Sequence, residues 1–343
     1  MKIPAAIRNM PKVELHQHLD GSIPPQVTWR IMKRYGLNPV DSLAEMRKLL
    51  QLQPDEEGSL LSYLDKFHYP MWITQFFENI TKVTEAVAAA AAKDGVKVFE
   101  LRYAPIIHIF AGLTVRQAIR SVLAGLNHAA KKYDIDVGLT VIAMRQHGPH
   151  VARILARAAV SEAEYLHDRT GVVGFDIAGA ERGNPPRLFA KAYEIARRGG
   201  LGLTAHAGED EAAHYIWQAI DELGCTRIGH GCSAIHDKQL LRRLARDRIL
   251  VECAPTSNYQ TGAVPRGQKH PVFTFLEHGV PVAICTDNTT VSRTSHSRES
   301  ALYVDELGIK TIREIHREAR AHSFIGHAAE WRKAREQKKG RYR

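Results

Sequence analysis

The sequence has few cysteines and no long hydrophobic run. Its four cysteines, Cys225, Cys232, Cys253 and Cys285, form no Cys-x-x-Cys pair and no dense framework, so they predict buried free thiols rather than disulfides. The longest apolar stretch, Val87 to Ala92, is much shorter than the roughly 20 residues that span a bilayer. A charged-then-apolar leader is also missing before the first predicted strand. We therefore expect a cytoplasmic protein with no membrane partner.

The net charge of +10 is concentrated at the end of the chain. Residues 331–343 hold seven Lys/Arg and one Glu, which leaves a net charge of only +4 on the other 330 residues. A basic tail of this kind is most often a solvated, frayed helix end. Because no recognition motif accompanies the charge, we expect no nucleic-acid partner.

Apolar runs alternate with amphipathic helical patterns along the chain. Buried strands are predicted at 12–16, 96–104, 136–144, 171–177, 201–206, 226–230, 249–253 and 281–286, and helices near 114–132, 149–168, 185–199, 210–222, 237–247 and from 298 onward. Eight strands in this alternation predict an α/β fold, a (β/α)8 TIM-type barrel. An open doubly wound sheet gives a similar string of elements.

Polar residues that could bind a metal ion or take part in catalysis follow four of the predicted strands. Their distribution favours the closed barrel. They are His16-Gln17-His18 after the first strand, His206-Ala207-Gly208-Glu209 after the fifth, Gly229-His230-Gly231 after the sixth and Thr286-Asp287-Asn288 after the eighth. An open sheet gathers its ligands at one switch point, whereas only closure brings these four strand ends together. We therefore predict a single barrel over residues 1–330, followed by the basic tail at 331–343.

The segment at about 24–94 is too long for an ordinary connection between the first two strands. Helical patterns near 25–35, 41–50 and 60–92 predict a helical lid over the mouth of the barrel. Leu61, Leu64 and Phe67 would supply an apolar wall there, although their spacing is equally that of a plain packed helix face.

The histidines at the strand ends suit a metal ion. Residues i and i+2 of a strand point to the same side, so His16 and His18 can reach one ion together. His206 and Asp287 end two other strands and would complete the set. Three imidazoles and one carboxylate leave a zinc-like ion with net positive charge and room for a water, whose pKa it lowers toward neutrality.

Two further residues are placed to act on a substrate. Glu209 stands three residues after His206, beyond a tight turn, and partial burial there would raise its pKa enough for it to carry a proton at neutral pH. An ordinary first-turn glutamate would also fit this position. His230, between two glycines, could orient the water or stabilise its charge.

At this point the sequence resembles the adenosine deaminase family of metal-dependent hydrolases, over nearly the whole chain. The motifs, in the family's order, are Pro11-Lys12-Val13-Glu14-Leu15-His16-Gln17-His18-Leu19-Asp20-Gly21-Ser22, Lys66-Phe67-His68-Tyr69-Pro70-Met71, Arg102-Tyr103-Ala104-Pro105, Met144-Arg145, Asp176-Ile177-Ala178-Gly179-Ala180-Glu181, His206-Ala207-Gly208-Glu209, Arg227-Ile228-Gly229-His230-Gly231, Pro255-Thr256-Ser257-Asn258 and Thr286-Asp287-Asn288.

The resemblance implies a role for each site residue. One zinc ion per chain would be held by His16, His18, His206 and Asp287, the catalytic residues would be Glu209, His230 and Asp287, and the substrate would be bound by Asp20, Gly179, His18 and Asn288. Glu209 would protonate the purine N1, and an activated water would add to C6, with His230 and Asp287 handling its proton and charge. The Gly179 N–H would meet N3, and Asp20 would accept a hydrogen bond from the ribose 5′-hydroxyl. Adenosine and deoxyadenosine would be deaminated, yielding ammonia and, from adenosine, inosine, as in purine salvage.

One residue departs from the pattern of the animal members of the family. They carry a second aspartate where this chain has Asn288. An asparagine donates a hydrogen bond through its amide without needing a proton, so recognition of the purine N7 is expected to survive with a different pH response.

Other functions stay open at this stage. A 5′-modified adenine nucleoside, such as aminodeoxyfutalosine (a menaquinone precursor) or methylthioadenosine, would use the same site. Free adenine is less consistent with Asp20, because adenine-specific members of the family tend to carry Glu there. A non-catalytic binding protein is disfavoured because all four ligands and Glu209 are present. A two-metal amidohydrolase would need a lysine after the fourth strand, where Ile177 and Ala178 stand.

Overall fold

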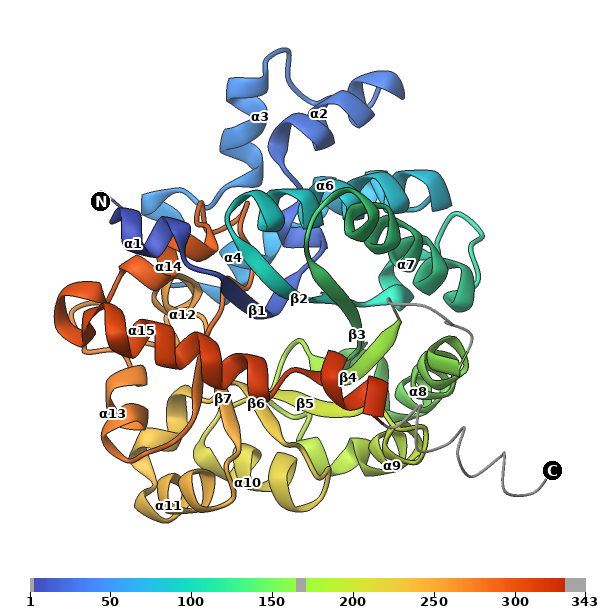
Figure 1. The fold of residues 1–343 in the computed structure, drawn as a ribbon. Helices are drawn as coiled ribbons and strands as arrows, with labels where there is room; N and C mark the ends of the chain where they lie inside the picture. The colour runs from blue at the N-terminus through green and yellow to red at the C-terminus, as the bar shows by residue number, and fades with distance from the viewer. Residues whose placement is uncertain (1–2, 165–170, 331–343) are drawn as a thin grey trace.

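The computed structural model describes residues 3–164 and 171–330, and all eight predicted strands form within them. The strands are β1 Lys12–His18, β2 Val96–Tyr103, β3 Asp136–Met144, β4 Val172–Ala178, β5 Gly202–Ala207, β6 Arg227–His230, β7 Leu250–Cys253 and β8 Val282–Ile284. Each pairs in parallel with the next along the chain, from β1 to β8. Figure 1 shows them at the centre of the molecule with helices around them. The barrel predicted from the sequence is confirmed.

A backbone bridge between β1 and the residues after β8 closes the barrel. Gln17 and Asp287 form an isolated parallel bridge. The backbone N–H of His18 donates to the carbonyl of Asp287 at 2.7 Å, and that of Asp287 donates to the carbonyl of His16 at 2.9 Å. Glu14 supports this seam from inside, because its carboxylate accepts hydrogen bonds from the backbone N–H of both His16 (2.8 Å) and Thr286 (3.0 Å). Closure therefore fixes the first and last strand ends next to each other.

Amphipathic helices cover the outside of the barrel. They include α6 Phe77–Lys93, α7 Val115–Lys132, α8 Gly148–Glu164, α9 Ala190–Arg198, α10 Ala213–Asp221, α11 Lys238–Arg246, α13 Val272–Glu277 and α15 Val304–Ala321. The start of α7 shows how the sequence sets a boundary: Thr114 and Gln117 form a reciprocal capping box. Short α1 Ala5–Asn9 precedes β1, whereas α12 Pro255–Thr261 and α14 His296–Ala301 lie in the connections.

The insertion after β1 differs from its prediction. The stretch at 60–92 is not one helical region but three helices, α4 Leu60–Asp65, α5 His68–Ile73 and α6. Pro70 lies in the first turn of α5, where proline is tolerated, and it cannot extend α4 because it has no N–H to donate. The last helix, α6, packs against β2 and α7 as a wall of the barrel. With α2 Pro25–Arg34 and α3 Leu43–Leu50, which project from the barrel in Figure 1, α4 and α5 form the inserted part.

The apolar residues predicted on the insertion do not form a packed face. Leu61 is 80% exposed and Leu64 46% exposed, so the interpretation as a plain packed helix face is wrong for both. Phe67 instead packs with Tyr63, Leu52 and Val291.

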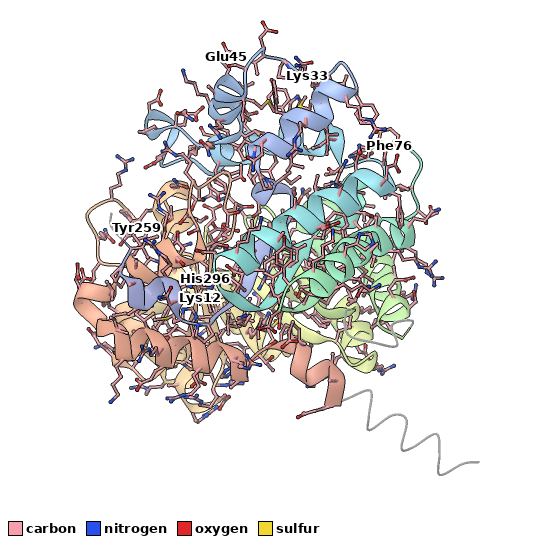
Figure 2. All side chains as sticks on the ribbon, turned by 45° about the horizontal axis from the view of Figure 1, so that its top comes forward. Lys12, Lys33, Glu45, Phe76, Tyr259 and His296 are labelled. Carbon is pink, nitrogen blue, oxygen red and sulfur yellow. The ribbon has the colours of Figure 1, made fainter. Side chains whose placement is uncertain are left out.

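Charged residues inside the barrel are paired with one another or with carbonyl groups. Figure 2 shows Lys12 and His296 close together, whereas Lys33 and Glu45 lie at the edge of the molecule. The Lys12 ammonium donates to the carbonyls of Met10 and Asp94, at 3.1 and 2.8 Å. Arg227 contacts both Glu100 (2.8 Å) and Glu252 (2.7 Å). Such pairing is what allows charge in a buried core.

Other sequence predictions have mixed outcomes. All four cysteines are free and buried, as predicted. Within residues 3–164 and 171–330, no helix is long and apolar enough to cross a membrane. The basic tail at 331–343 lies outside the described residues, and so does the end of the helix predicted at 149–168.

Candidate active site

Three histidines from two strands converge at the carboxyl ends of the barrel. His16 and His18 of β1 and His206 of β5 bring their Nε2 atoms within 3.1–3.3 Å of one another. Asp287 Oδ1 lies 3.3 Å from His18 Nε2 and 3.8 Å from His16 Nε2. Four ligands placed tetrahedrally at about 2.0–2.1 Å from a zinc ion would lie about 3.3 Å apart. The three Nε2 atoms, and Asp287 Oδ1 with that of His18, therefore have the spacing of ligands to one metal ion.

Carboxylates behind the histidines turn their Nε2 atoms toward this point. His16 Nδ1 lies 3.0 Å from Glu252, and His206 Nδ1 lies 2.9 Å from Asp176. Arg102 pairs with both carboxylates, at 2.6 Å from Asp176. A proton on each Nδ1 leaves the Nε2 lone pair free for a cation, which is the usual arrangement behind metal-bound histidines.

The ionisation of the cluster fits this arrangement. Burial, followed by the positive charges around it, lowers the pKa of His16 and of His18 well below the ordinary value. His206 differs: burial opposes its protonation, but the charge and hydrogen bond of Asp176, with the charge of Glu209, raise its pKa overall. A cation at Nε2 would replace that proton, because metal ligands must be deprotonated.

Asp287 adopts a strained backbone conformation beyond the end of β8. The strand ends at Ile284, two residues earlier than predicted, and Asp287 has a left-handed φ of 58°. Non-glycine residues rarely adopt such angles, and they concentrate at functional sites. Ser257, on α12, donates to Asp287 Oδ2 at 2.6 Å, so that Oδ1 is the oxygen near the histidines.

Glu209 lies beside the cluster and is mostly but not fully buried, with 15% of its side chain exposed. Burial, and after it the charge of Asp287, raises the pKa of Glu209 to about 7. The raised pKa expected from the sequence is therefore present. The carboxylate of Glu181 accepts hydrogen bonds from the backbone N–H of Asp210 and Glu211, at 3.1 and 2.8 Å, and so holds the loop that carries Glu209.

His230 lies between Glu209 and the histidine cluster. Its Nε2 is 3.5 Å from Glu209 Oε2, and its ring centroid is 4.9 Å from that of His16. The glycine before it is needed for packing, because a Cβ on Gly229 would lie 3.0 Å from the His16 ring. His16, His206 and His230 together could also hold a metal ion by distance alone.

The residues predicted to bind substrate lie around the same barrel mouth. Asp20 follows β1 in a short 3-10 turn, and burial raises its pKa to about 6. Gly179 follows β4 with φ of 91°, where a Cβ would lie 2.6 Å from Gln146 Oε1. Asn288 is buried, and its Oδ1 has no hydrogen-bond partner among the described residues.

Sequence reasoning missed the residues that support the cluster. Glu14, Arg102, Asp176 and Glu252 all have no solvent exposure. Each is a charged residue inside an apolar strand, and buried charges must be paired, so the pattern itself could have marked them. Glu14, Arg102, Asp176, Ser257 and Asn258 entered the sequence analysis only as members of family motifs, with no role assigned, and Glu252 did not enter it.

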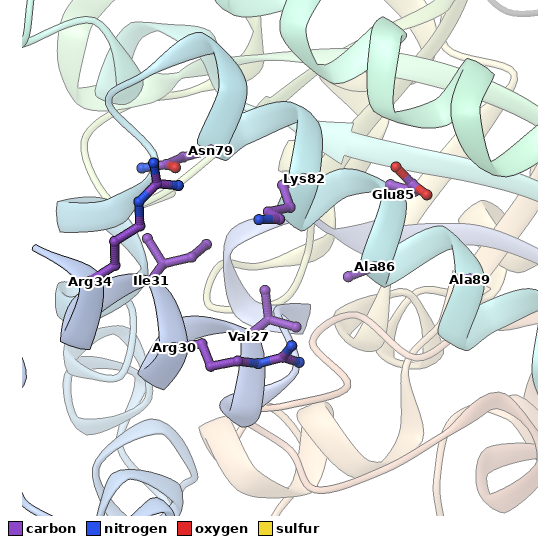
Figure 3. Close-up of a pocket in the computed structure, with 9 residues that line it drawn as sticks. All are labelled: Val27, Arg30, Ile31, Arg34, Asn79, Lys82, Glu85, Ala86 and Ala89. Atoms are coloured by element: carbon purple, nitrogen blue, oxygen red, sulfur yellow. The ribbon is translucent and has the colours of Figure 1, made fainter.

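A surface groove lies away from the residues of the candidate active site. Figure 3 shows a groove of about 490 Å³ between α2 and α6, with Arg30 and Arg34 on one side and Lys82 on the other. None of the site residues lines it.

A closed barrel with three histidines and an aspartate at its carboxyl ends defines a metal-dependent hydrolase of the α/β-barrel class. The family model described as adenosine deaminase matches residues 11–336. The adenosine deaminase of Shewanella loihica is 34% identical over 302 residues, which cover 88% of this chain and 89% of that protein. The chain therefore belongs to the adenosine deaminase family and is an aminohydrolase that acts on C–N bonds.

Solved structures agree in fold. The arabidopsis protein ADAL, complexed with IMP, superposes with a TM-score of 0.80 at 26% identity and covers 93% of both chains. An amidohydrolase from Burkholderia ambifaria with bound Zn has a TM-score of 0.83 at 24% identity, covering 97% of this chain and 93% of that one.

Proposed function

We propose that the protein hydrolyses adenosine and deoxyadenosine at C6, in purine salvage in the cytoplasm, releasing ammonia and forming inosine from adenosine. One observation carries this proposal: the mostly buried carboxyl of Glu209, with a pKa raised to about 7, lies 3.5 Å from His230 beside the proposed metal-ligand side chains. Such a carboxyl holds a proton near neutral pH and can donate it to a ring nitrogen. The free, buried cysteines support the cytoplasmic location.

The donor set supports one zinc ion per chain, held by His16, His18, His206 and Asp287. Imidazole nitrogens with one carboxylate oxygen are ligands that zinc favours, and the 3.1–3.3 Å between the Nε2 atoms suits its tetrahedral geometry. When bound, the ion supplies a water whose pKa is lowered toward neutrality.

Different residues of the chain then act on different atoms of the purine. Glu209 gives its proton to N1, which makes C6 electrophilic. Asp287, oriented by Ser257, takes the proton of the attacking water, and His230 stabilises the charge that develops on its oxygen. The proton on Asp287 then passes to the 6-amino group, which leaves as ammonia when the C6–N bond breaks. The Gly179 N–H donates to N3, and the Asn288 amide donates to N7. His18 also contacts the substrate from the metal side.

Asp20 supports a nucleoside rather than a nucleotide as the substrate. No side chain among the described residues donates a hydrogen bond to its carboxylate, although Asp20 is only 7% exposed. A ribose 5′-hydroxyl would satisfy this acceptor. A 5′-phosphate would instead place its negative charge beside the Asp20 carboxylate. We therefore do not expect this site to bind a nucleotide such as the IMP in the ADAL complex.

A 5′-modified nucleoside remains the second candidate, because Leu61 and Leu64 expose apolar surface on the insertion. The test is a panel of adenosine, deoxyadenosine, methylthioadenosine, aminodeoxyfutalosine, adenine and AMP. Deamination is followed by the ultraviolet change of the 6-amino chromophore, with Glu209→Gln as the background control. We expect the highest kcat/KM for adenosine or deoxyadenosine. Preference for either extended nucleoside would replace the substrate and keep the chemistry.

A further inference from the structure

A buried row of hydrogen bonds leads away from His230, from the ring nitrogen that does not face Glu209. Asn258 Nδ2 lies 2.9 Å from His230 Nδ1, and Asn258 Oδ1 lies 3.1 Å from His270 Nε2. The row ends at the backbone, where the N–H of Val272 meets His270 Nδ1 at 3.1 Å. His230, Asn258 and His270 are at most 1% exposed, so water does not compete for these contacts.

The direction of every hydrogen bond in this row follows from its backbone end. A backbone N–H can only donate, so His270 Nδ1 is an acceptor and the ring proton is on Nε2. His270 Nε2–H then donates to an oxygen, which places Oδ1 of Asn258 on that side. The Asn258 amide nitrogen is left to donate to His230 Nδ1, so this nitrogen carries no proton. The proton of His230 is therefore on Nε2.

We infer that Asn258 and His270 are positioning residues that hold His230 as an Nε2–H hydrogen-bond donor toward the reacting centre. The inference deepens the proposed function and rests on it for the identity of the reaction. In this tautomer His230 has no lone pair on the nitrogen that faces Glu209. It therefore stabilises the developing oxyanion and does not remove the proton of the water, which leaves Asp287 as the base.

Two further observations support the role of Asn258 and His270. Burial lowers the pKa of His270 to about 3, so its ring holds one proton near pH 7. Asn258 belongs to α12, whose short polar sequence Pro255–Thr261 buries its Ser257 and Asn258 side chains against the site. One helix thus orients Asp287 through Ser257 and His230 through Asn258.

The test is an exchange of donor for acceptor in zinc-loaded enzyme. Asn258→Asp keeps the shape of the side chain but cannot donate, so a proton should appear on His230 Nδ1. Nitrogen-15 spectra of histidine-labelled protein report this directly, with the His230 signals assigned from their loss in His230→Gln. For adenosine, kcat should fall at least about 10-fold while KM and metal content change little. Asn79→Asp, which places a carboxylate at another buried asparagine, should leave both readouts unchanged.

His270 provides an independent pair of variants. His270→Gln can still donate to Asn258 Oδ1 and should keep the wild-type spectrum and rate, whereas His270→Leu cannot donate and should give a mixture of His230 tautomers with a lower kcat. The inference is overturned if wild-type His230 carries its proton on Nδ1, or if Asn258→Asp leaves either the spectrum or kcat unchanged. If Asn258→Asp does not fold, the His270 pair decides, and equal rates and spectra for Gln and Leu overturn it. Absence of adenosine turnover in the wild type would refute the proposed function, while the spectra would still test the tautomer.

Discussion

The backbone N–H of His18 donates a hydrogen bond to the carbonyl of Asp287, 2.7 Å away, across the seam where the barrel closes. Both residues also belong to the proposed ligand set, with His18 Nε2 3.3 Å from Asp287 Oδ1. Closure of the barrel therefore also brings two of the four proposed ligands together. A bound ion would tie the first and last strands together and stabilise the fold.

Metal content is the first prediction. Purified protein should contain about one equivalent of zinc by elemental analysis, and chelation should lower both the thermal midpoint and the activity. His206→Ala should lose the metal, because it removes one of the convergent Nε2 atoms. His214→Ala, at an exposed histidine of α10, serves as the control and should keep it. Full activity after complete demetallation would refute the metal assignment.

The pH dependence of stability gives a second prediction, for metal-free protein. Glu209 has a folded-state pKa of about 7, above its ordinary value of 4.5, so between these values the folded state binds more protons. Its contribution to stability is complete below about pH 4.5 and is lost as the pH rises through about 7. The free energy of unfolding of Glu209→Gln should therefore equal that of the wild type at pH 4.5. At pH 8 it should be larger than that of the wild type, by at most about 3 kcal/mol. Unfolding by urea at the two pH values measures this, and a difference that does not vary with pH would contradict it.

The third prediction concerns Asp20 and the 5′-hydroxyl. Without that hydroxyl the buried carboxylate keeps only a backbone hydrogen bond, and the missing partner costs about 1–3 kcal/mol or more. 5′-Deoxyadenosine should therefore have a kcat/KM at least roughly 10-fold below that of adenosine, and Asp20→Ala should shrink this gap. Asp55→Ala, at an exposed aspartate of the insertion, is the control and should preserve the gap. An equal ratio of kcat/KM for the two nucleosides in wild type and Asp20→Ala would show that Asp20 does not contact the 5′-hydroxyl.

The strands and the ligand positions could be predicted because they depend on local patterns. A strand buried on both faces is a continuous apolar run, and a polar residue directly after it lies at the mouth of a barrel. His16, His18 and His206 lie within the last residues of β1 and β5 and so reach the same mouth. Asp287 lies three residues beyond the observed end of β8, where a left-handed backbone returns it to the cluster, and the sequence shows no sign of that conformation.

Other features depend on tertiary contacts and could not be predicted. The breaks around α5 separate three helices that share one hydrophobic pattern, and only Pro70 marks the first of them. Helix α12 has no amphipathic pattern, because its buried residues Ser257 and Asn258 are polar and face the site. The pairing of Glu252 with His16 joins β7 to β1, and no spacing in the sequence encodes which buried acid meets which histidine.

The central claim is that Glu209 supplies the ring proton beside an intact metal site, and one variant tests it most directly. Glu209→Gln keeps the size of the side chain but cannot donate an acidic proton. Metal content and kcat for adenosine are measured on the same sample, with Glu222→Gln on the exposed end of α10 as the control. We predict unchanged zinc and a fall in kcat on the order of 10²-fold or more. A variant that keeps its zinc and wild-type kcat, or that loses zinc and regains the full rate when zinc is added, would contradict the account.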